Sequence, residues 1–205
     1  MNIDAITVCV DYSKYLALTI QNKTIFDRWL IVTVEQDKDT IALCKREGLE
    51  YCFSPRLYEG GPFCKGKAIN DGLMQLRPQD WVCILDADTY LFPALRGAIE
   101  KANLNIDCLY GLYGRLLVKD EKELKAILSR DSIAKDELEH IGLMVGFFQM
   151  WHSSMRQFYP EQSIHAGLDD ILMRDSYNID RRLILPSYAI HIGEMWVNHK
   201  GVPRV

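Results

Sequence analysis

The sequence lacks a long hydrophobic run, a signal-peptide pattern and an excess of positive charge. No apolar stretch approaches the roughly 18 residues that a membrane-spanning helix needs. The N-terminal segment MNIDAITVCV has neither the charged start nor the apolar stretch of a secretory signal. The net charge is −4, so no global positive field attracts nucleic acid or anionic membranes, although a local basic patch is compatible with it. These absences predict a soluble, cytoplasmic protein.

Paired-cysteine motifs are also absent. The six cysteines form no C-x-x-C pair and no Cys/His group with zinc spacing. Cys9, Cys83 and Cys108 lie inside apolar runs, where a free thiol behaves as a small buried hydrophobe. The cysteines are therefore expected to be reduced.

Short apolar runs alternate with amphipathic stretches in the first half of the chain. Ser13 and Asp39 are the expected helix N-caps, and Gly48 is the expected stop of the second helix. The predicted strands cover residues 6–10, 29–34, 50–53 and 81–85, and the predicted helices cover residues 13–26, 39–46 and 65–76. This rhythm predicts an α/β fold with a doubly wound, mainly parallel sheet and helices on both faces.

The second half is less regular and predicts a small antiparallel addition to the sheet. Expected helices cover residues 94–102, 120–129 and 168–177, and expected strands cover residues 108–113, 115–118, 143–151, 183–185 and 188–192. The tail, residues 194–205, has glycine and polar punctuation and is expected to be a loop.

Two aspartates, Asp86 and Asp88, follow the apolar run 81–85 directly. Since side chains alternate along an extended chain, both carboxylates can face one side while Ala87 turns away. Oxygen ligands of this kind suit Mg²⁺ or Mn²⁺. With 17 aspartates in 205 residues, chance alone produces about one D-x-D pair. Asp37 and Asp39 form such a second pair, which precedes a helix and suits capping.

The stretch 81–93, WVCILDADTYLFP, resembles the central strand of GT-A glycosyltransferases, particularly the large inverting family that includes cellulose and chitin synthases. In that family the D-x-D motif binds the divalent metal of a nucleotide-sugar, usually a UDP-sugar. The resemblance implies that Asp88 ligates Mn²⁺ or Mg²⁺ and that Asp86 contacts the ribose or the water shell of the metal. It also implies one catalytic domain over residues 1–205, with a nucleotide-binding half over about 1–92, an acceptor-side half over about 93–193 and a loop over 194–205.

The turn after the first predicted strand, Val10-Asp11-Tyr12, resembles the nucleoside-binding turn of that family. It departs from the family pattern because the usual acidic-acidic-glycine-serine signature is missing. Glu35, after the second strand, takes the position of a second nucleoside contact. Ordinary polar strand ends explain Asp11 and Glu35 equally well.

A glycine- and lysine-containing segment, residues 60–70, precedes and opens the third helix. Lys65 and Lys67 stand at a helix start, where free N–H groups and the helix dipole favour phosphate. The spacing from Lys67 to Asn70 resembles the basic-x-x-Asn segment that lies near the diphosphate in the family. The segment is not a Walker P-loop, because the G-K-[ST] ending is absent.

Sugar transfer to a hydroxyl needs a base for the proton of the acceptor. Asp170 is the chosen candidate and Asp169 the alternative, because paired carboxylates raise one pKa and inverting relatives carry an acidic pair at a helix start. Capping alone also explains Asp169. By resemblance to the C-terminal His-x-Gly segment of compact GT-A enzymes, His191 completes the metal site, with His199 as the alternative.

The acceptor is the least defined part of the prediction. Gln149, Trp151 and Trp196 are candidate acceptor contacts, through stacking or hydrogen bonding. The acceptor hydroxyl is expected on a glycan, on a small molecule or on a hydroxymethylated base of phage DNA. Basic residues that could form a DNA track are Lys119, Arg181, Arg182, Lys200 and Arg204. Two alternatives stay open: a nucleotidyltransferase of the same fold, disfavoured by the glycine-free turn at Asp11, and a non-catalytic nucleotide-sugar binder.

Overall fold

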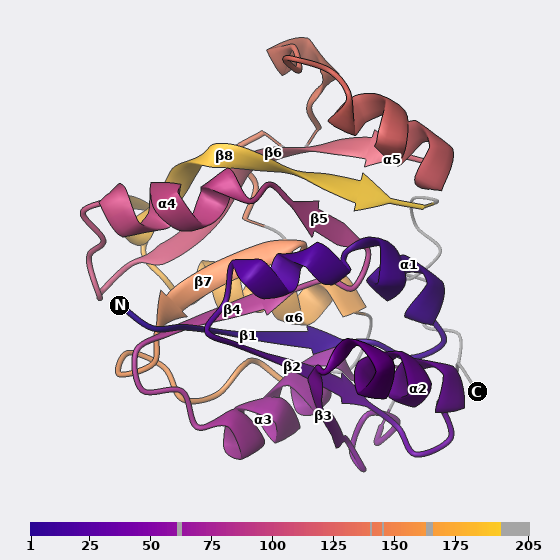
Figure 1. Cartoon of the computed structure of the whole chain (residues 1–205). Helices are drawn as coiled ribbons and strands as arrows, with labels where there is room; N and C mark the ends of the chain where they lie inside the picture. Colours follow the sequence, from indigo (N-terminus) through magenta and orange to yellow (C-terminus); the bar gives the residue numbers. More distant parts are fainter. Residues whose placement is uncertain (61–62, 140, 145, 163–165, 194–205) are drawn as a thin grey trace.

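The computed structural model describes residues 1–60, 63–139, 141–144, 146–162 and 166–193 (Figure 1). The strands are β1 (Ile3–Val8), β2 (Arg28–Thr33), β3 (Glu50–Phe53), β4 (Trp81–Leu85), β5 (Thr89–Leu91), β6 (Leu109–Val118), β7 (Phe148–His152) and β8 (Arg182–Ile192). The α-helices are α1 (Ser13–Leu18), α2 (Lys38–Glu47), α3 (Lys65–Leu76), α4 (Ala94–Lys101), α5 (Glu121–Leu128) and α6 (Ala166–Asp175). Short 3₁₀ helices cover Ile20–Thr24, Lys135–Glu137 and Ile179–Arg181.

All eight strands form one mixed sheet in the order β3-β2-β1-β4-β7-β6-β8-β5. The first-half strands β3, β2, β1 and β4 are parallel neighbours, and β6 pairs parallel with β8. β7 runs antiparallel to both β4 and β6, and β5 runs antiparallel to β8. The predicted α/β class, with a mainly parallel sheet and a small antiparallel addition, is confirmed.

Helices cover both faces of the sheet. One face packs against α1, α2 and α4, and the other packs against α3 and α6; in Figure 1, α1 lies in front of the sheet and α6 behind it. Successive residues of β4 alternate between the two cores, with Cys83 on the first face and Ile84 on the second. The continuous apolar run of β4 follows from this burial on both sides.

The helix starts differ from the prediction. The carboxylate of Asp37, not that of Asp39, caps α2 by accepting a hydrogen bond from the backbone N–H of Thr40 at 3.0 Å. Ser13 is the first residue of α1 rather than its cap. Gly48 ends α2 as predicted, in the left-handed conformation with φ 67°.

The single helix predicted over residues 13–26 is wrong, because α1 ends at Leu18 and a 3₁₀ helix follows. The hydroxyl of Thr19 donates to the carbonyl of Ala87, and the amide of Asn22 bonds the backbone of Thr89 and Leu91. These side chains hold the segment after β4. The α-helix therefore ends before Thr19, and the following residues form a 3₁₀ helix.

The strand predictions in the second half were too short or misplaced. β6 and β8 are each one long strand with a register shift between Leu112 and Gly114, where two strands apiece were expected. β7 begins at Phe148 rather than at residue 143, and β5 was not predicted. Within the described part of the chain, no helix is both long enough and apolar enough to cross a membrane.

Candidate active site

Three adjacent parallel strands, β2, β1 and β4, end at the same edge of the sheet. The predicted nucleoside and metal residues follow these ends: Asp11 after β1, Glu35 after β2 and Asp86 after β4. In open α/β sheets, ligands bind beyond the carboxyl ends of the strands. The topology therefore brings the predicted donor-binding residues to one edge.

The turn after β1 contains a residue with a strained backbone conformation. Asp11 has φ 57°, a left-handed conformation that costs energy for a residue with a Cβ. Its backbone N–H donates to Oδ2 of Asp37 at 2.9 Å, which fixes the turn against the start of α2. Val10 is buried, Tyr12 is half-buried and the side chains of Asp11 and Glu35 are exposed. Asp37 of the second D-x-D thus has a structural role.

The side chains of Asp88 and His191 lie next to each other, because Asp88 directly precedes β5 and His191 lies on the paired strand β8. Thr89 of β5 pairs with His191 of β8, and the backbone N–H of Ile192 donates to the carbonyl of Asp88 at 2.8 Å. This pairing places Nδ1 of His191 3.4 Å from Oδ1 of Asp88. Burial raises the pKa of Asp88, the charge of His191 lowers it, and nearby Asp86 raises it further.

Lys65, the first residue of α3, bridges two carboxylates from distant parts of the chain. Its Nζ lies 2.7 Å from Oδ1 of Asp86 and 3.0 Å from Oδ2 of Asp170. Its side chain is only 7% exposed. Burial by itself would lower the pKa of Lys65, but the charges of Asp170 and Asp86 raise it above its ordinary value. A fixed cation therefore joins the acidic end of β4 to the start of α6.

Asp170 is buried, and its second oxygen, Oδ1, lies 2.7 Å from the hydroxyl of Tyr159. Burial raises the pKa of Asp170, the charge of Lys65 lowers it, and that of Asp86 raises it again. Gly146 makes room for the pair, because a Cβ there would stand 1.8 Å from Oδ2 of Asp170 and 2.7 Å from Nζ of Lys65. The predicted base is thus a firmly held carboxyl group beside a cation.

A metal fits this corner in part. Among the described residues, no group of three or more His, Cys, Asp or Glu side chains gathers to hold an ion. The structure brings Asp88 and His191 together, while Asp86 is turned toward Lys65. Nδ1 of His191 is buried without a hydrogen-bond partner among the described residues. Carboxylate and imidazole donors suit Mn²⁺, so the chemistry of the donor set agrees with the prediction. His199 lies outside the described residues.

Asp169 differs from Asp170 although the two are adjacent. Its Oδ2 accepts the backbone N–H of Gly66 at 2.9 Å, and its Oδ1 accepts the backbone N–H of Gln162 at 2.7 Å. The side chain is fully buried. Both oxygens are engaged by backbone donors, so Asp169 clamps α6 to the start of α3. This geometry favours Asp170 over Asp169 as the candidate base.

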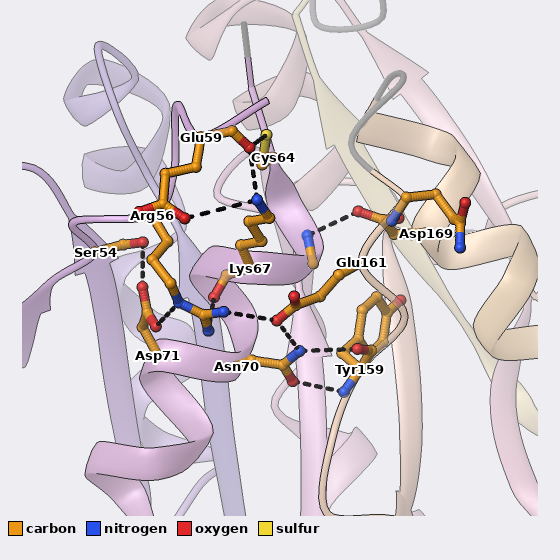
Figure 2. A network of polar contacts seen from close by, with 12 residues as sticks. Ser54, Arg56, Glu59, Cys64, Lys67, Asn70, Asp71, Tyr159, Glu161 and Asp169 are labelled. Carbon is orange, nitrogen blue, oxygen red and sulfur yellow. Dashed lines mark hydrogen bonds and ion pairs between the residues drawn. The ribbon is translucent and has the colours of Figure 1, made fainter. Parts of the chain in front are cut away.

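Lys67 and Asn70 belong to a structural network beside the site (Figure 2). The amide of Asn70 donates to the carbonyl of Tyr159 and to Oε1 of Glu161, and its oxygen accepts the N–H of Tyr159 at 2.6 Å. The hydrogen-bonding groups of Asn70 are thus used by the protein, and its contact with a diphosphate stays a prediction. Lys67 donates to the carbonyl of Glu59 at 2.7 Å, in the loop before α3.

Two of the three predicted acceptor contacts are buried in the structure. Trp151 and Gln149 are 0% exposed on β7, so neither a ring face nor an amide reaches an incoming acceptor. The indole of Trp151 donates to the carbonyl of Arg156 at 3.1 Å. Both residues are part of the interior, which corrects this prediction, and Trp196 lies outside the described residues.

The structure adds two residues that the sequence reasoning missed. Tyr159 approaches Asp170 from a loop, and no local pattern marks it. Arg115 interrupts the apolar strand β6, which is a readable signal. Its Nε is buried without a hydrogen-bond partner in the described part of the chain, and its guanidinium lies over the ring of Phe147. Burial lowers the pKa of Arg115, while the charges of Asp86 and Asp88 raise it.

The basic residues proposed as a DNA track are not gathered. Arg182 pairs with Leu109 at the start of β6, whereas Lys119 follows its end, so about 30 Å of strand separates them. Arg181 and Arg182 are in addition paired with the carboxylates of Asp107 and Asp175. Lys200 and Arg204 lie outside the described residues.

The fold is that of the GT-A glycosyltransferases, as the resemblance implied. A structure of glucosyl-3-phosphoglycerate synthase from Mycobacterium tuberculosis with phosphoglyceric acid aligns with a TM-score of 0.58 and 12% identity, over 93% of this chain and 71% of that chain. The same synthase with Mn²⁺, UDP-glucose and phosphoglyceric acid aligns with a TM-score of 0.57 and 13% identity, over 95% and 73%.

A third structure, the same synthase with Mn²⁺ and UDP-glucose, aligns with a TM-score of 0.58 and 13% identity, over 95% of this chain and 72% of that chain. No model of a known protein family matches the sequence. No curated protein shows significant sequence similarity either. Because the sequence identities are low, these similarities establish the fold alone.

Proposed function

We propose that this chain is a metal-dependent glycosyltransferase that moves a sugar from a nucleotide-sugar to an acceptor hydroxyl. The observation that carries the proposal is the acidic corner after β4. There Asp88 meets His191 at 3.4 Å, and Asp86 lies at the edge where β1 and β2 also end. The structurally similar synthase is solved with Mn²⁺ and UDP-glucose, which makes a UDP-sugar the first donor to test.

Asp88 and His191 would hold Mn²⁺ or Mg²⁺, joined by Asp86. The bound ion would supply charge neutralisation for the departing diphosphate. Asp86 is paired with Lys65 in the structure, so its participation requires it to turn from that ammonium group. Lys65 also provides fixed positive charge at the start of α3, next to Asp86.

Asp170 is the proposed general base, which implies an inverting reaction. Its Oδ2 lies on the side of Lys65 and Asp86, while its Oδ1 faces the interior at Tyr159. Oδ2 is therefore the oxygen that can take the proton of the acceptor hydroxyl. Measuring the anomeric configuration of the first product by NMR tests this assignment, and retention of configuration would contradict it.

The acceptor is proposed to be a hydroxyl on a glycan or a small molecule. Lys119 and Arg182 lie at opposite ends of β6, so these two residues do not form a continuous basic track for DNA. The similar synthase is solved with phosphoglyceric acid, so acidic hydroxy compounds belong in the acceptor screen. Hydroxymethylated DNA is the comparison acceptor.

The test is release of UDP from UDP-sugars with Mn²⁺ and each acceptor class. Asp88→Asn should abolish release, because it removes a charged metal ligand. The matched control is Asp39→Asn, which changes the exposed aspartate of the second D-x-D and should retain full activity. No release with any donor, metal and acceptor, or equal activity of Asp88→Asn and Asp39→Asn, would refute the proposal. Pyrophosphate release from a nucleoside triphosphate would indicate a nucleotidyltransferase instead.

A further inference from the structure

Three buried side-chain oxygens lie in a row, and the last of them belongs to Asp170, the proposed base. The hydroxyl oxygen of Tyr159 stands 2.5 Å from Oε1 of Gln149 and 2.7 Å from Oδ1 of Asp170. All three residues are buried, with exposures of 3%, 0% and 4% for Tyr159, Gln149 and Asp170. Contacts between oxygens at these distances each require a hydrogen.

The orientation of the Gln149 amide is fixed by its other contacts. Its Nε2 donates to the carbonyl of Met144 at 3.1 Å and to the carbonyl of Asp170 at 2.9 Å. A flipped amide would place its oxygen against these two carbonyl oxygens, which is repulsive. Oε1 therefore faces Tyr159 and can act only as an acceptor.

A count of hydrogens then determines the state of Asp170. Tyr159 has one hydroxyl hydrogen and two oxygen neighbours. Gln149 has no hydrogen to give on that side, so the tyrosine hydrogen satisfies the contact with Gln149. The second contact needs a hydrogen from Asp170, because two oxygens without one would repel at this distance.

We infer that Asp170 rests in the protonated form, with its proton on Oδ1 donated to Tyr159, and that Tyr159 and Gln149 are positioning residues that hold it there. As a statement about the base, this inference rests on the proposed function. The base becomes active only when the Oδ1 proton leaves to solvent. Oδ2, which contacts the ammonium group of Lys65, then accepts the proton of the acceptor hydroxyl.

The charged groups around Asp170 are consistent with a proton on its carboxyl group. Lys65 of α3 contacts Oδ2, Asp86 after β4 lies on the other side of Lys65, and Asp169 precedes it on α6. One ammonium group thus faces both Asp86 and Asp170. Burial raises the pKa of Asp170 most, Lys65 lowers it through its charge and its hydrogen bond, and the charge of Asp86 raises it again, so the net shift of this pKa is upward.

The sign of one pKa shift tests the inference. Tyr159→Phe removes the acceptor of the Asp170 proton, so the protonated form loses a hydrogen bond and the pKa of Asp170 should fall, by about one unit. If Tyr159 instead donates to an ionised Asp170, the same change removes a donor and the pKa should rise. The matched control is Tyr177→Phe, whose buried hydroxyl has no partner among the described residues and packs in the same core.

Infrared spectroscopy of protein labelled with ¹³C-aspartate measures this pKa without donor or acceptor. At pH 7 the unmodified protein should show a protonated-carboxyl C=O band that is missing in Asp170→Asn. The band should titrate away at lower pH in Tyr159→Phe and at an unchanged pH in Tyr177→Phe. Absence of the band at pH 7, or a rise of the pKa in Tyr159→Phe, would overturn the inference.

The infrared result separates this inference from the proposed function. If transfer activity is absent but the band and its shift are found, the proton arrangement stands and the function fails. If transfer is found, its rate should rise with pH through the pKa of Asp170, and the midpoint should move down in Tyr159→Phe. Should Asp170→Asn fail to fold, the direction of the shift in Tyr159→Phe still decides.

Discussion

Replacing Gly146 by alanine tests whether the buried pair of Lys65 and Asp170 is as tightly fitted as the structure shows. A Cβ at position 146 would stand 1.8 Å from Oδ2 and 2.4 Å from Cγ of Asp170. Ordinary contact needs about 3.5 Å, so the carboxyl group must move by roughly 1.5 Å. It cannot move freely, because Lys65 holds Oδ2 and Tyr159 holds Oδ1.

The expected loss follows from these contacts. Overpacking a dense interior costs about 1–3 kcal/mol, and losing the buried hydrogen bond from the Lys65 ammonium group to Asp170 costs about 1.5–3 kcal/mol. Since Lys65 keeps Asp86 as a second partner, we expect Gly146→Ala to lower the free energy of unfolding by about 3 kcal/mol, near the lower end of the summed range of about 2.5–6 kcal/mol. Urea denaturation followed by circular dichroism measures it.

Gly97 provides a control of opposite sign. It lies inside α4, and a Cβ there meets nothing within 4 Å. Gly97→Ala should therefore stabilise the protein by about 0.5–1 kcal/mol, because alanine favours the helix. If Gly146→Ala is as stable as the unmodified protein while Gly97→Ala behaves as expected, the packing described around Asp170 is refuted.

Other predictions use the same structure. Lys65→Met should lower the free energy of unfolding, measured in urea, by about 3–5 kcal/mol, and Lys67→Met should lower it by less than about 1 kcal/mol. Equal losses would contradict the role of Lys65 as the buried cation between Asp86 and Asp170. Burial raises the pKa of Cys9 to about 12 and that of Cys52 to about 11, so iodoacetamide should barely label these two thiols in the native protein at pH 8, and their rapid labelling before unfolding would refute this. Trp151→Phe should lower stability by about 1–3 kcal/mol through its lost hydrogen bond and leave the KM for the acceptor unchanged, whereas a large KM change would restore Trp151 as an acceptor contact.

The first half of the fold could be predicted because its signals are local. The apolar run of β4 and the amphipathic pattern of α3 give their observed bounds, and Gly48 ends α2 as expected. The break after α1 could not be predicted, because Thr19 bonds the carbonyl of Ala87, 68 residues away. Local propensity contains no information about such a partner.

The candidate site divides in the same way. The position of Asp86 and Asp88 follows from the end of β4, which the sequence shows. The different roles of Asp169 and Asp170 do not, because they depend on which partners reach each oxygen. Tyr159 comes from a loop whose path is set by contacts with Asn70, 89 residues away in the sequence.

The most direct test of the central claim is calorimetric titration of the protein with UDP, with and without Mn²⁺. Binding of UDP should depend on Mn²⁺, should be lost in Asp88→Asn and should be kept in Asp39→Asn. Binding of equal strength without a divalent ion, or no binding in its presence, would contradict the claim that the corner of Asp88 and His191 is a metal-dependent nucleotide-sugar site.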